Sequence, residues 1–104
     1  MISVVIPCLN EAHFIDATLQ SLLDQMDPGE PWEVIVADGG SDDGTREHLV
    51  QWQDAHAQFS WVDNPRRTTP HALNAGIAAS QGDTIIILGA HAQVDSDFLL
   101  RNAE

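Results

Sequence analysis

The sequence has no lysine and only four arginines, against 16 aspartates and glutamates, so its formal net charge is −12. Binding to nucleic acid needs a basic surface that offsets the backbone phosphates, and this composition excludes one. Solubility is a sufficient reason for such acidity. A ligand that carries phosphate would need local help from an arginine, a helix N-terminus or a metal ion.

Cysteines and long apolar segments are also scarce. Cys8 is the only cysteine, which excludes a disulfide framework. The longest apolar run, residues 85–88, is far too short to span a bilayer. The first residues, MISVVIPCLNE, have no basic segment and no small-residue cleavage site, so they do not form a signal peptide. We therefore expect a cytoplasmic protein, and 104 residues suit one compact domain.

Strand-like and helix-like segments alternate along the chain. Short apolar, β-branched runs predict strands at residues 2–6, 33–37, 59–62 and 84–88. Helical patterns predict helices at 11–25, 43–55 and 69–80, and a last helix that begins near residue 96 and is still running at 104. The alternation indicates parallel βαβ units. The predicted fold class is α/β: a Rossmann-like, mostly parallel sheet of about four strands, flanked by helices on both faces.

Residue types at the helix ends predict where each helix begins and stops. Asn10 is a candidate N-cap of the first helix, and Thr69 of the third, with Pro70 in its first turn. Gly82 is expected to close the third helix. The apolar positions expected to face the core include Phe14, Leu49, Val50 and Trp52.

Polar residues gather after each predicted strand. In an open parallel sheet, ligands bind outside the carboxyl ends of the strands, so these residues form one candidate site. The second loop, DGGSDDGT at residues 38–45, offers three carboxylates, and its glycines let a ligand approach the backbone. The candidates in the other loops are Pro7, Asn10 and Glu11, then Asn64, Arg66 and Arg67, then Gly89, Ala90 and His91.

The loop at residues 38–45 has two interpretations. Either Asp38 accepts hydrogen bonds from a base or ribose, or the loop is only a tight turn in which Ser41 or Asp42 caps the next helix. The loop has neither the GK[ST] ending of a Walker loop nor a G-x-G-x-x-G pattern. Its acidity would repel a pyrophosphate, so it is expected to face the base and ribose or to hold a metal.

Residues elsewhere at this edge also have more than one interpretation. Arg66 and Arg67 either pair with phosphate or balance the acidic surface. Gly76 either contacts a ligand or allows close packing between helix and sheet, and Asn74 on the same helix is placed to reach the site. His91 ligates a metal, contacts phosphate or lies at the surface as an ordinary histidine.

Several motifs in a fixed order resemble the N-terminal signatures of family 2 glycosyltransferases. They are VVIPCLNE, VIVADGGSDDGT, the loop with Arg67, LNAGIAASQGDTIIIL and the following GAH. GAHAQVDSDFL is similar to the branch of succinoglycan-type exopolysaccharide glycosyltransferases. The resemblance implies a GT-A fold, of which residues 1–104 are the N-terminal, nucleotide-sugar-binding part. It also implies that the acceptor site and the catalytic base lie in a C-terminal part beyond this chain.

The resemblance carries roles onto individual residues. It implies that the nucleotide pocket is lined by Pro7, Asn10 and Glu11, and that Asp38 contacts the base, most often uracil. It places Ser41 and Asp42 beside the nucleotide, and Arg67 and Asn74 near the base and diphosphate. The family's metal-binding DxD-type element reads Gly89-Ala90-His91 here. His91 is then the expected ligand of a divalent metal, Mn²⁺ or Mg²⁺, although imidazole suits later transition metals better.

The resemblance implies transfer of a sugar from a nucleotide-diphospho-sugar, a UDP-sugar in most members, to a polysaccharide or lipid-linked acceptor, with inversion. One alternative is a nucleotide-binding half-domain without catalysis. Another is an unrelated Rossmann-like protein, but a receiver would need a lysine, and a nucleotidyltransferase a basic glycine-rich loop in place of PCLNEAH. The fourth strand would be a bare sheet edge, so we expect self-association. A longer parent protein would work at the cytoplasmic face of the membrane.

Overall fold

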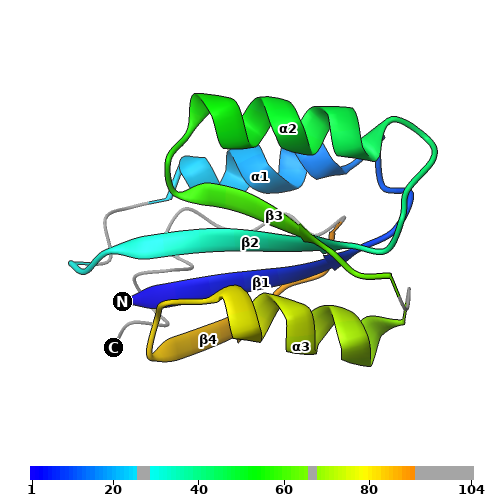
Figure 1. Ribbon diagram of the computed structural model, residues 1–104. Coiled ribbons are helices and arrows are strands. Elements are labelled where there is room, and N and C mark those ends of the chain that lie inside the picture. The colour runs from blue at the N-terminus through cyan, green and yellow to red at the C-terminus, as the bar shows by residue number, and fades with distance from the viewer. Residues whose placement is uncertain (26–28, 66–67, 91–104) are drawn as a thin grey trace.

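The computed structural model describes residues 1–25, 29–65 and 68–90. Strands and helices alternate through these residues, as the sequence predicts (Figure 1). The strands lie within about two residues of their predicted bounds. The elements are β1 (Ile2–Cys8), α1 (Ile15–Leu23), β2 (Trp32–Asp38), α2 (Thr45–Ala55), β3 (Phe59–Asp63), α3 (Thr69–Ala79) and β4 (Thr84–Ile87). The helix predicted from residue 96 lies outside the described residues.

The four strands form one parallel sheet in the order β3-β2-β1-β4. The chain moves outward from β1 to β3 and then returns through α3 to place β4 on the other side of β1. Figure 1 shows α1 and α2 on one face of the sheet and α3 on the other. The predicted α/β class, with helices on both faces, is therefore confirmed, and the carboxyl ends of all four strands lie at one edge of the sheet.

The core forms on both faces of β1. Ile2, Val4 and Ile6 are fully buried and belong to one cluster with residues of α1, α2 and β2. Val5 points to the opposite face, where α3 lies so close that a Cβ on Gly76 would come within 2.4 Å of Val5 Cγ1. Gly76 therefore serves close packing of helix against sheet, one of the two roles left open by the sequence.

The first helix begins later than predicted, and Asn10 does not cap it. The N-cap is Phe14, without a side-chain hydrogen bond, and residues 12–14 form a turn before α1. Asn10 has a φ of 54° and accepts a hydrogen bond from the backbone of Asp42 instead. The capping prediction was wrong because this side chain is satisfied by another loop rather than by its own helix.

The other capping predictions were also wrong in detail. Gly44 is the N-cap of α2, with a φ of 100° that only glycine adopts without strain, so neither Ser41 nor Asp42 caps this helix. The N-cap of α3 is Thr68 rather than Thr69, and the Thr68 hydroxyl bonds to His71 Nδ1 rather than capping the helix backbone. Pro70 does lie in the first turn of α3, as predicted.

Gly82 does not close α3, which ends three residues earlier at Ala79. A Cβ on Gly82 would lie 2.4 Å from Ser3 Oγ and 2.7 Å from the carbonyl oxygen of Met1, so the glycine allows a close approach to β1. Among the residues predicted to face the core, Leu49 is buried and Trp52 half-buried, whereas the predictions for Phe14 and Val50 were wrong because both are exposed.

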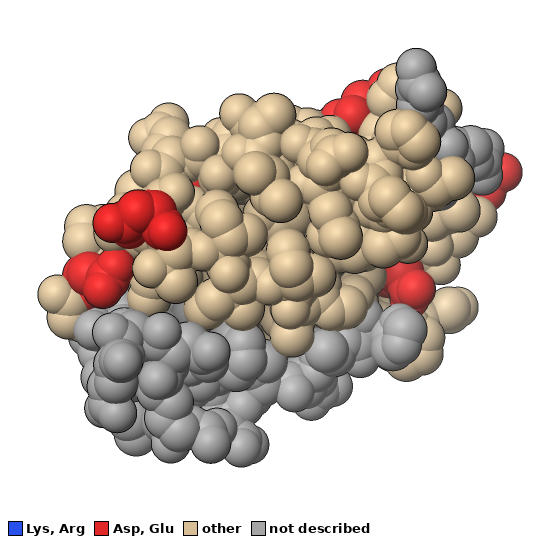
Figure 2. Space-filling model, turned by 90° about the horizontal axis from the view of Figure 1, so that it is seen from below, with Lys and Arg blue, Asp and Glu red and all other residues tan. Residues whose placement is uncertain are grey.

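The face that carries α3 is almost free of charge. The helix has no Asp, Glu, Lys or Arg, and Figure 2 shows Asp and Glu only at the margin of this face. Ile77 and Ile87 are about half exposed on α3 and β4. Among the described residues, the acidic side chains therefore lie away from the middle of this face. No helix among the described residues is long and apolar enough to cross a membrane.

The contact between Gly76 and Val5 leads to a first prediction. Gly76→Ala should lower the free energy of unfolding by about 1–3 kcal/mol, because the new methyl group overlaps a fully buried, stiff side chain. Urea unfolding measures the loss. Gly89→Ala is the matched control, since nothing lies within 4 Å of a Cβ there. Equal effects of the two substitutions would contradict the proposed role of close packing.

Candidate functional site

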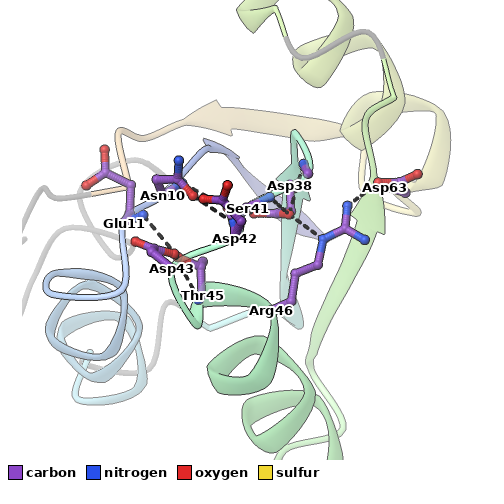
Figure 3. Close-up of polar contacts among 10 residues, drawn as sticks. Asn10, Glu11, Asp38, Ser41, Asp42, Asp43, Thr45, Arg46 and Asp63 are labelled. Atoms are coloured by element: carbon purple, nitrogen blue, oxygen red, sulfur yellow. Dashed lines mark hydrogen bonds and ion pairs between the residues drawn. The ribbon is translucent and has the colours of Figure 1, made fainter.

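The loops that follow β1 and β2 are joined by hydrogen bonds (Figure 3). The backbone N–H of Asn10 donates to Ser41 Oγ at 2.8 Å, and the N–H of Asp42 donates to Asn10 Oδ1 at 2.9 Å. The N–H of Glu11 donates to Thr45 Oγ1 at 3.0 Å. The structure thus brings Asn10, Ser41 and Asp42 together, as the sequence predicts, but it uses their polar groups to fasten one loop to the other.

Asp38 lies at the centre of this arrangement, and its side chain has no exposed surface. Ser41 Oγ donates to Oδ1, while the N–H groups of Gly40 and Ser41 and the Nε of Arg46 donate to Oδ2. Burial raises the pKa of Asp38, but the hydrogen bonds from Ser41, Arg46 and Gly40 outweigh it and hold the pKa below its ordinary value. Direct contact with a base stays a prediction, and it would require the ligand to reach a side chain that has no exposed surface here.

Asp43 is a third acceptor that supports the loops. It accepts hydrogen bonds from the backbone N–H of Ala12, at 3.2 Å, and from both the N–H and the hydroxyl of Thr45. The bond from the Thr45 hydroxyl is the main reason why the pKa of Asp43 is lowered. Two of the three carboxylates in the acidic loop therefore act as structural acceptors in this conformation.

Arg46 bridges the ends of two strands. Its Nε donates to Asp38 at 2.7 Å, a terminal nitrogen donates to Asp63 at the end of β3, and the guanidinium centre lies 5.1 Å from the Trp61 ring centroid. It is the only Arg or Lys among the described residues. Nothing in the sequence around Arg46 indicates this role, because its partners lie eight and 17 residues away.

A hollow of about 230 Å³ opens at the same edge, between the ends of β1 and β3 and the start of α3. Its lining includes three candidate site residues, Pro7, Glu11 and Asn64. Cys8 also lines it, but burial and then the negative charges of Asp38, Glu11 and Asp43 raise the pKa of its thiol to about 12. The thiol is therefore protonated and is not a nucleophile. The lining residues are Pro7, Cys8, Leu9, Glu11, Asn64, Thr68, Thr69 and Ala72.

Asn64 presents an open hydrogen-bond acceptor to this hollow. The residue is only 3% exposed, its Nδ2 donates to the carbonyl oxygen of Thr68 at 3.0 Å, and its backbone N–H donates to the carbonyl oxygen of Asp38 at 2.8 Å. Oδ1 has no hydrogen-bond partner among the described residues. Every buried side-chain oxygen in this part of the chain does have a partner, so Oδ1 is not buried and reaches the open space. Its position after β3 was the only signal for it in the sequence.

The remaining predicted residues are more scattered. Asn74 is exposed on α3 and is not among the residues that line the hollow. Gly89 is exposed after β4, and the next residue, Ala90, is anchored because Thr18 Oγ1 donates to its carbonyl oxygen at 2.8 Å. Arg67 and His91 lie outside the described residues.

The described residues do not form a metal site. No group of three or more His, Cys, Asp or Glu residues is placed to hold an ion within residues 1–25, 29–65 and 68–90. Gly89 offers no side chain, although the space around it is open. These residues alone do not fit a divalent metal.

A larger, shallower hollow of about 660 Å³ lies at the opposite ends of the strands, beside Trp32 and Gln58. No predicted site residue lines it. The convergence of polar groups therefore favours the smaller hollow as the candidate site.

The model of a protein family described as glycosyl transferase family 2 matches residues 3–104, which is nearly the whole chain. The chain belongs to glycosyl transferase family 2. Two of the segments that resembled this family in the sequence, the loop after β1 and the loop after β3, line the hollow of this family 2 domain.

Two curated relatives are similar over almost the full family 2 domain. A dolichyl N-acetyl-alpha-D-glucosaminyl phosphate 3-beta-D-2,3-diacetamido-2,3-dideoxy-beta-D-glucuronosyltransferase of Methanococcus voltae is 36% identical over 99% of this chain and 33% of its own length. The succinoglycan biosynthesis protein ExoA of Rhizobium meliloti is 36% identical over 97% of this chain and 31% of its own. The chain thus spans about a third of the length of the curated relatives it matches.

A solved structure shares the fold. The mannosyltransferase PcManGT from Pyrobaculum calidifontis, in complex with GDP-Man and Mn²⁺, superposes with a TM-score of 0.85 at 31% sequence identity. The match covers 95% of this chain and 30% of that one. The four-stranded parallel sheet and its helices are therefore the GT-A type of Rossmann-like architecture, as the resemblance implied.

The hydrogen bonds of Asp38 predict how acid affects the family 2 domain. The pKa of Asp38 is lowered in the folded state. The contribution of its carboxylate to the free energy of unfolding is therefore complete above pH ~4, and it is lost as the pH falls through the folded-state pKa. Asp38→Asn should cost about 1–3 kcal/mol at pH 7, since its amide group would face donors. The variant should then lose less stability than the native chain between neutral and acidic pH.

Urea unfolding from pH 7 to pH 2 measures both effects. Glu47→Gln, an exposed position on α2, is the control for the change of one charge. Identical pH profiles of the native chain and Asp38→Asn would show that the buried carboxylate does not stabilise the loop.

Proposed function

We propose that this family 2 domain binds the nucleotide part of a nucleotide-diphospho-sugar, and that its protein transfers the sugar, with inversion, to a polysaccharide or lipid-linked acceptor. The observation that carries the proposal is the hollow at the carboxyl edge of the sheet, with the open Oδ1 of Asn64 in its wall. Membership of the family and the joined loops beside the hollow support it. No residue of the chain is assigned as the catalytic base.

The hollow suits a base rather than a whole donor. Its volume is below the about 300–1,000 Å³ of pockets that enclose drug-sized ligands. Asn64 Oδ1 would accept a hydrogen bond from the imide N–H of uracil or the ring N–H of guanine, while Pro7 and Leu9 supply apolar contacts. The family resemblance favours uracil, whereas the relative from Pyrobaculum calidifontis is in complex with GDP-Man. We propose a UDP-sugar as the donor, with a GDP-sugar as the competing candidate.

The diphosphate would lie beside the start of α3. Thr68 and Thr69 line the hollow at this helix N-terminus, where the helix dipole favours an anion. Arg46 is already paired with two carboxylates, so we propose that Arg67 and His91 contact the diphosphate. Use of Mn²⁺ or Mg²⁺ with His91 as a ligand also stays a proposal, supported by the Mn²⁺ in the relative's complex.

A nucleotide-binding half-domain without catalysis is the alternative. It is supported by the structural use of Asp38 and Asp43, whose carboxylates bind protein groups rather than open space. Both functions predict nucleotide binding, and they differ in sugar transfer. Release of UDP from a UDP-sugar by a longer protein that contains this domain, in the presence of acceptor, would favour the enzyme. The expected cytoplasmic location, at the membrane face in a longer parent, also stays a proposal.

Titration of UDP and GDP, with and without Mn²⁺, tests the proposal. We expect saturable binding, and we expect Asn64→Ala to weaken it by about 5- to 150-fold, which corresponds to an unmade hydrogen bond of about 1–3 kcal/mol. Gln51→Ala, an exposed change on α2, should leave the affinity unchanged. Asn74→Ala tests the role that the resemblance gives to Asn74.

Absence of binding to either nucleotide under all conditions would contradict the donor-site proposal. Binding that Asn64→Ala leaves unchanged would instead show that the base binds outside this hollow. A preference for GDP over UDP would replace the uracil assignment while keeping the site.

Self-association is a separate proposal. Within the described residues β4 pairs only with β1, and the neighbouring face exposes Ile77 and Ile87 without nearby charge on α3 (Figure 2). An edge that is unpaired among the described residues, beside a helix without Asp, Glu, Lys or Arg, favours pairing with a second copy. Light scattering over a concentration series should show a mass that rises with concentration, and Ile87→Lys should reduce it. A constant monomer mass would exclude this pairing.

A further inference from the structure

We propose that Arg46 is a positioning residue for nucleotide recognition, which holds the base-binding wall in place without touching the nucleotide. The inference rests on the proposed nucleotide site. It starts from the fact that Arg46 binds one carboxylate at the end of β2 and another at the end of β3 (Figure 3). A single side chain from α2 thereby joins the carboxylates of two strand ends that the sheet also pairs, Asp38 with Asp63.

The two carboxylates that Arg46 binds are both connected to Asn64. Asp63 precedes Asn64 in the chain, and the carbonyl oxygen of Asp38 accepts the backbone N–H of Asn64 at 2.8 Å. A shift of β3 relative to β2 would therefore move the open Oδ1 of Asn64 in the wall of the hollow. Displacements of about 1 Å in a binding group are enough to cost large factors in function.

Arg46 also acts on the loops on the other side of the hollow. It donates to Asp38 Oδ2, Asp38 Oδ1 accepts from Ser41 Oγ, and Ser41 Oγ accepts from the backbone N–H of Asn10. This chain of hydrogen bonds runs from α2 to the loop after β1, which carries Glu11 in the lining. One guanidinium thus supports both sides of the candidate base site.

The bonding of Arg46 argues against a direct role in binding phosphate. Its partner Asp38 has no exposed surface, and removing the cation from a buried carboxylate is strongly unfavourable. The guanidinium also lies over the Trp61 ring, 5.1 Å from its centroid. Lysine is a poor substitute, because a single ammonium cannot reproduce the fork that reaches two carboxylates.

A comparison of uridine with UDP separates positioning from phosphate binding. Amide NMR titrations of the native chain, Arg46→Gln and Arg46→Lys with each ligand give both the affinity and the folded state. We expect Arg46→Gln to weaken the binding of uridine and of UDP by the same factor, about tenfold or more. Arg46→Lys should recover part of the lost affinity. Glu47→Gln, the exposed neighbour on α2, should leave both affinities unchanged. If the native chain prefers guanine, guanosine and GDP take the place of these ligands.

Asp63→Asn provides a second variant that keeps the pair of Arg46 with buried Asp38. The Asp63 side chain is 57% exposed, so the variant should fold. It should also weaken the binding of nucleoside and of nucleotide by equal factors. If Arg46→Gln gives the spectrum of an unfolded chain, the affinities of Asp63→Asn decide whether Arg46 is a positioning residue.

Three outcomes would overturn the inference. Weaker binding of UDP with unchanged binding of uridine would make Arg46 a phosphate ligand. Unchanged affinities in folded Arg46→Gln or in Asp63→Asn would remove its positioning role while leaving the proposed function intact. Failure of the native chain to bind any of the nucleosides or nucleotides would overturn both proposals together.

Discussion

The buried carboxylate of Asp38 is the constraint on which the rest of the site depends. A charge without exposed surface is strongly destabilising unless hydrogen bonds and an opposite charge compensate it. Here two backbone N–H groups, the Ser41 hydroxyl and the Arg46 guanidinium supply that compensation. Satisfying this one group fixes the end of β2, the loop that follows it and the first turn of α2 relative to one another.

From Asp38 the constraint extends to the neighbouring strand ends. Ser41 also accepts the backbone N–H of Asn10 after β1, and the carbonyl oxygen of Asp38 holds Asn64 after β3. Hydrogen bonds therefore join three strand ends at the edge of the sheet where the hollow lies. Because these loops are ordered before binding, a ligand does not have to offset the conformational entropy lost in ordering them. This is the physical advantage of building a recognition site on a rigid parallel sheet.

The sequence predicted the strands well and the helix caps poorly, and the two results have one physical explanation. Strands such as β1 are buried on both faces, so the apolar run itself records their position. A cap depends on which donor a short polar side chain meets. Asn10 meets the backbone of Asp42, 32 residues away, and Gly82 meets Ser3, 79 residues away, so neither plays the local role that its residue type suggests.

The sequence by itself determined the alternation of strands and helices, the parallel sheet, the edge where polar residues gather and the family. Each of these follows from local patterns or from motifs in a fixed order. Only the tertiary structure decided which polar groups bind the protein and which remain open to a ligand. Asp38 and Asn10 proved to be engaged, Arg46 bridges two carboxylates, and Asn64 keeps an open acceptor. Such pairing depends on distances between segments far apart in the chain, which no local pattern records.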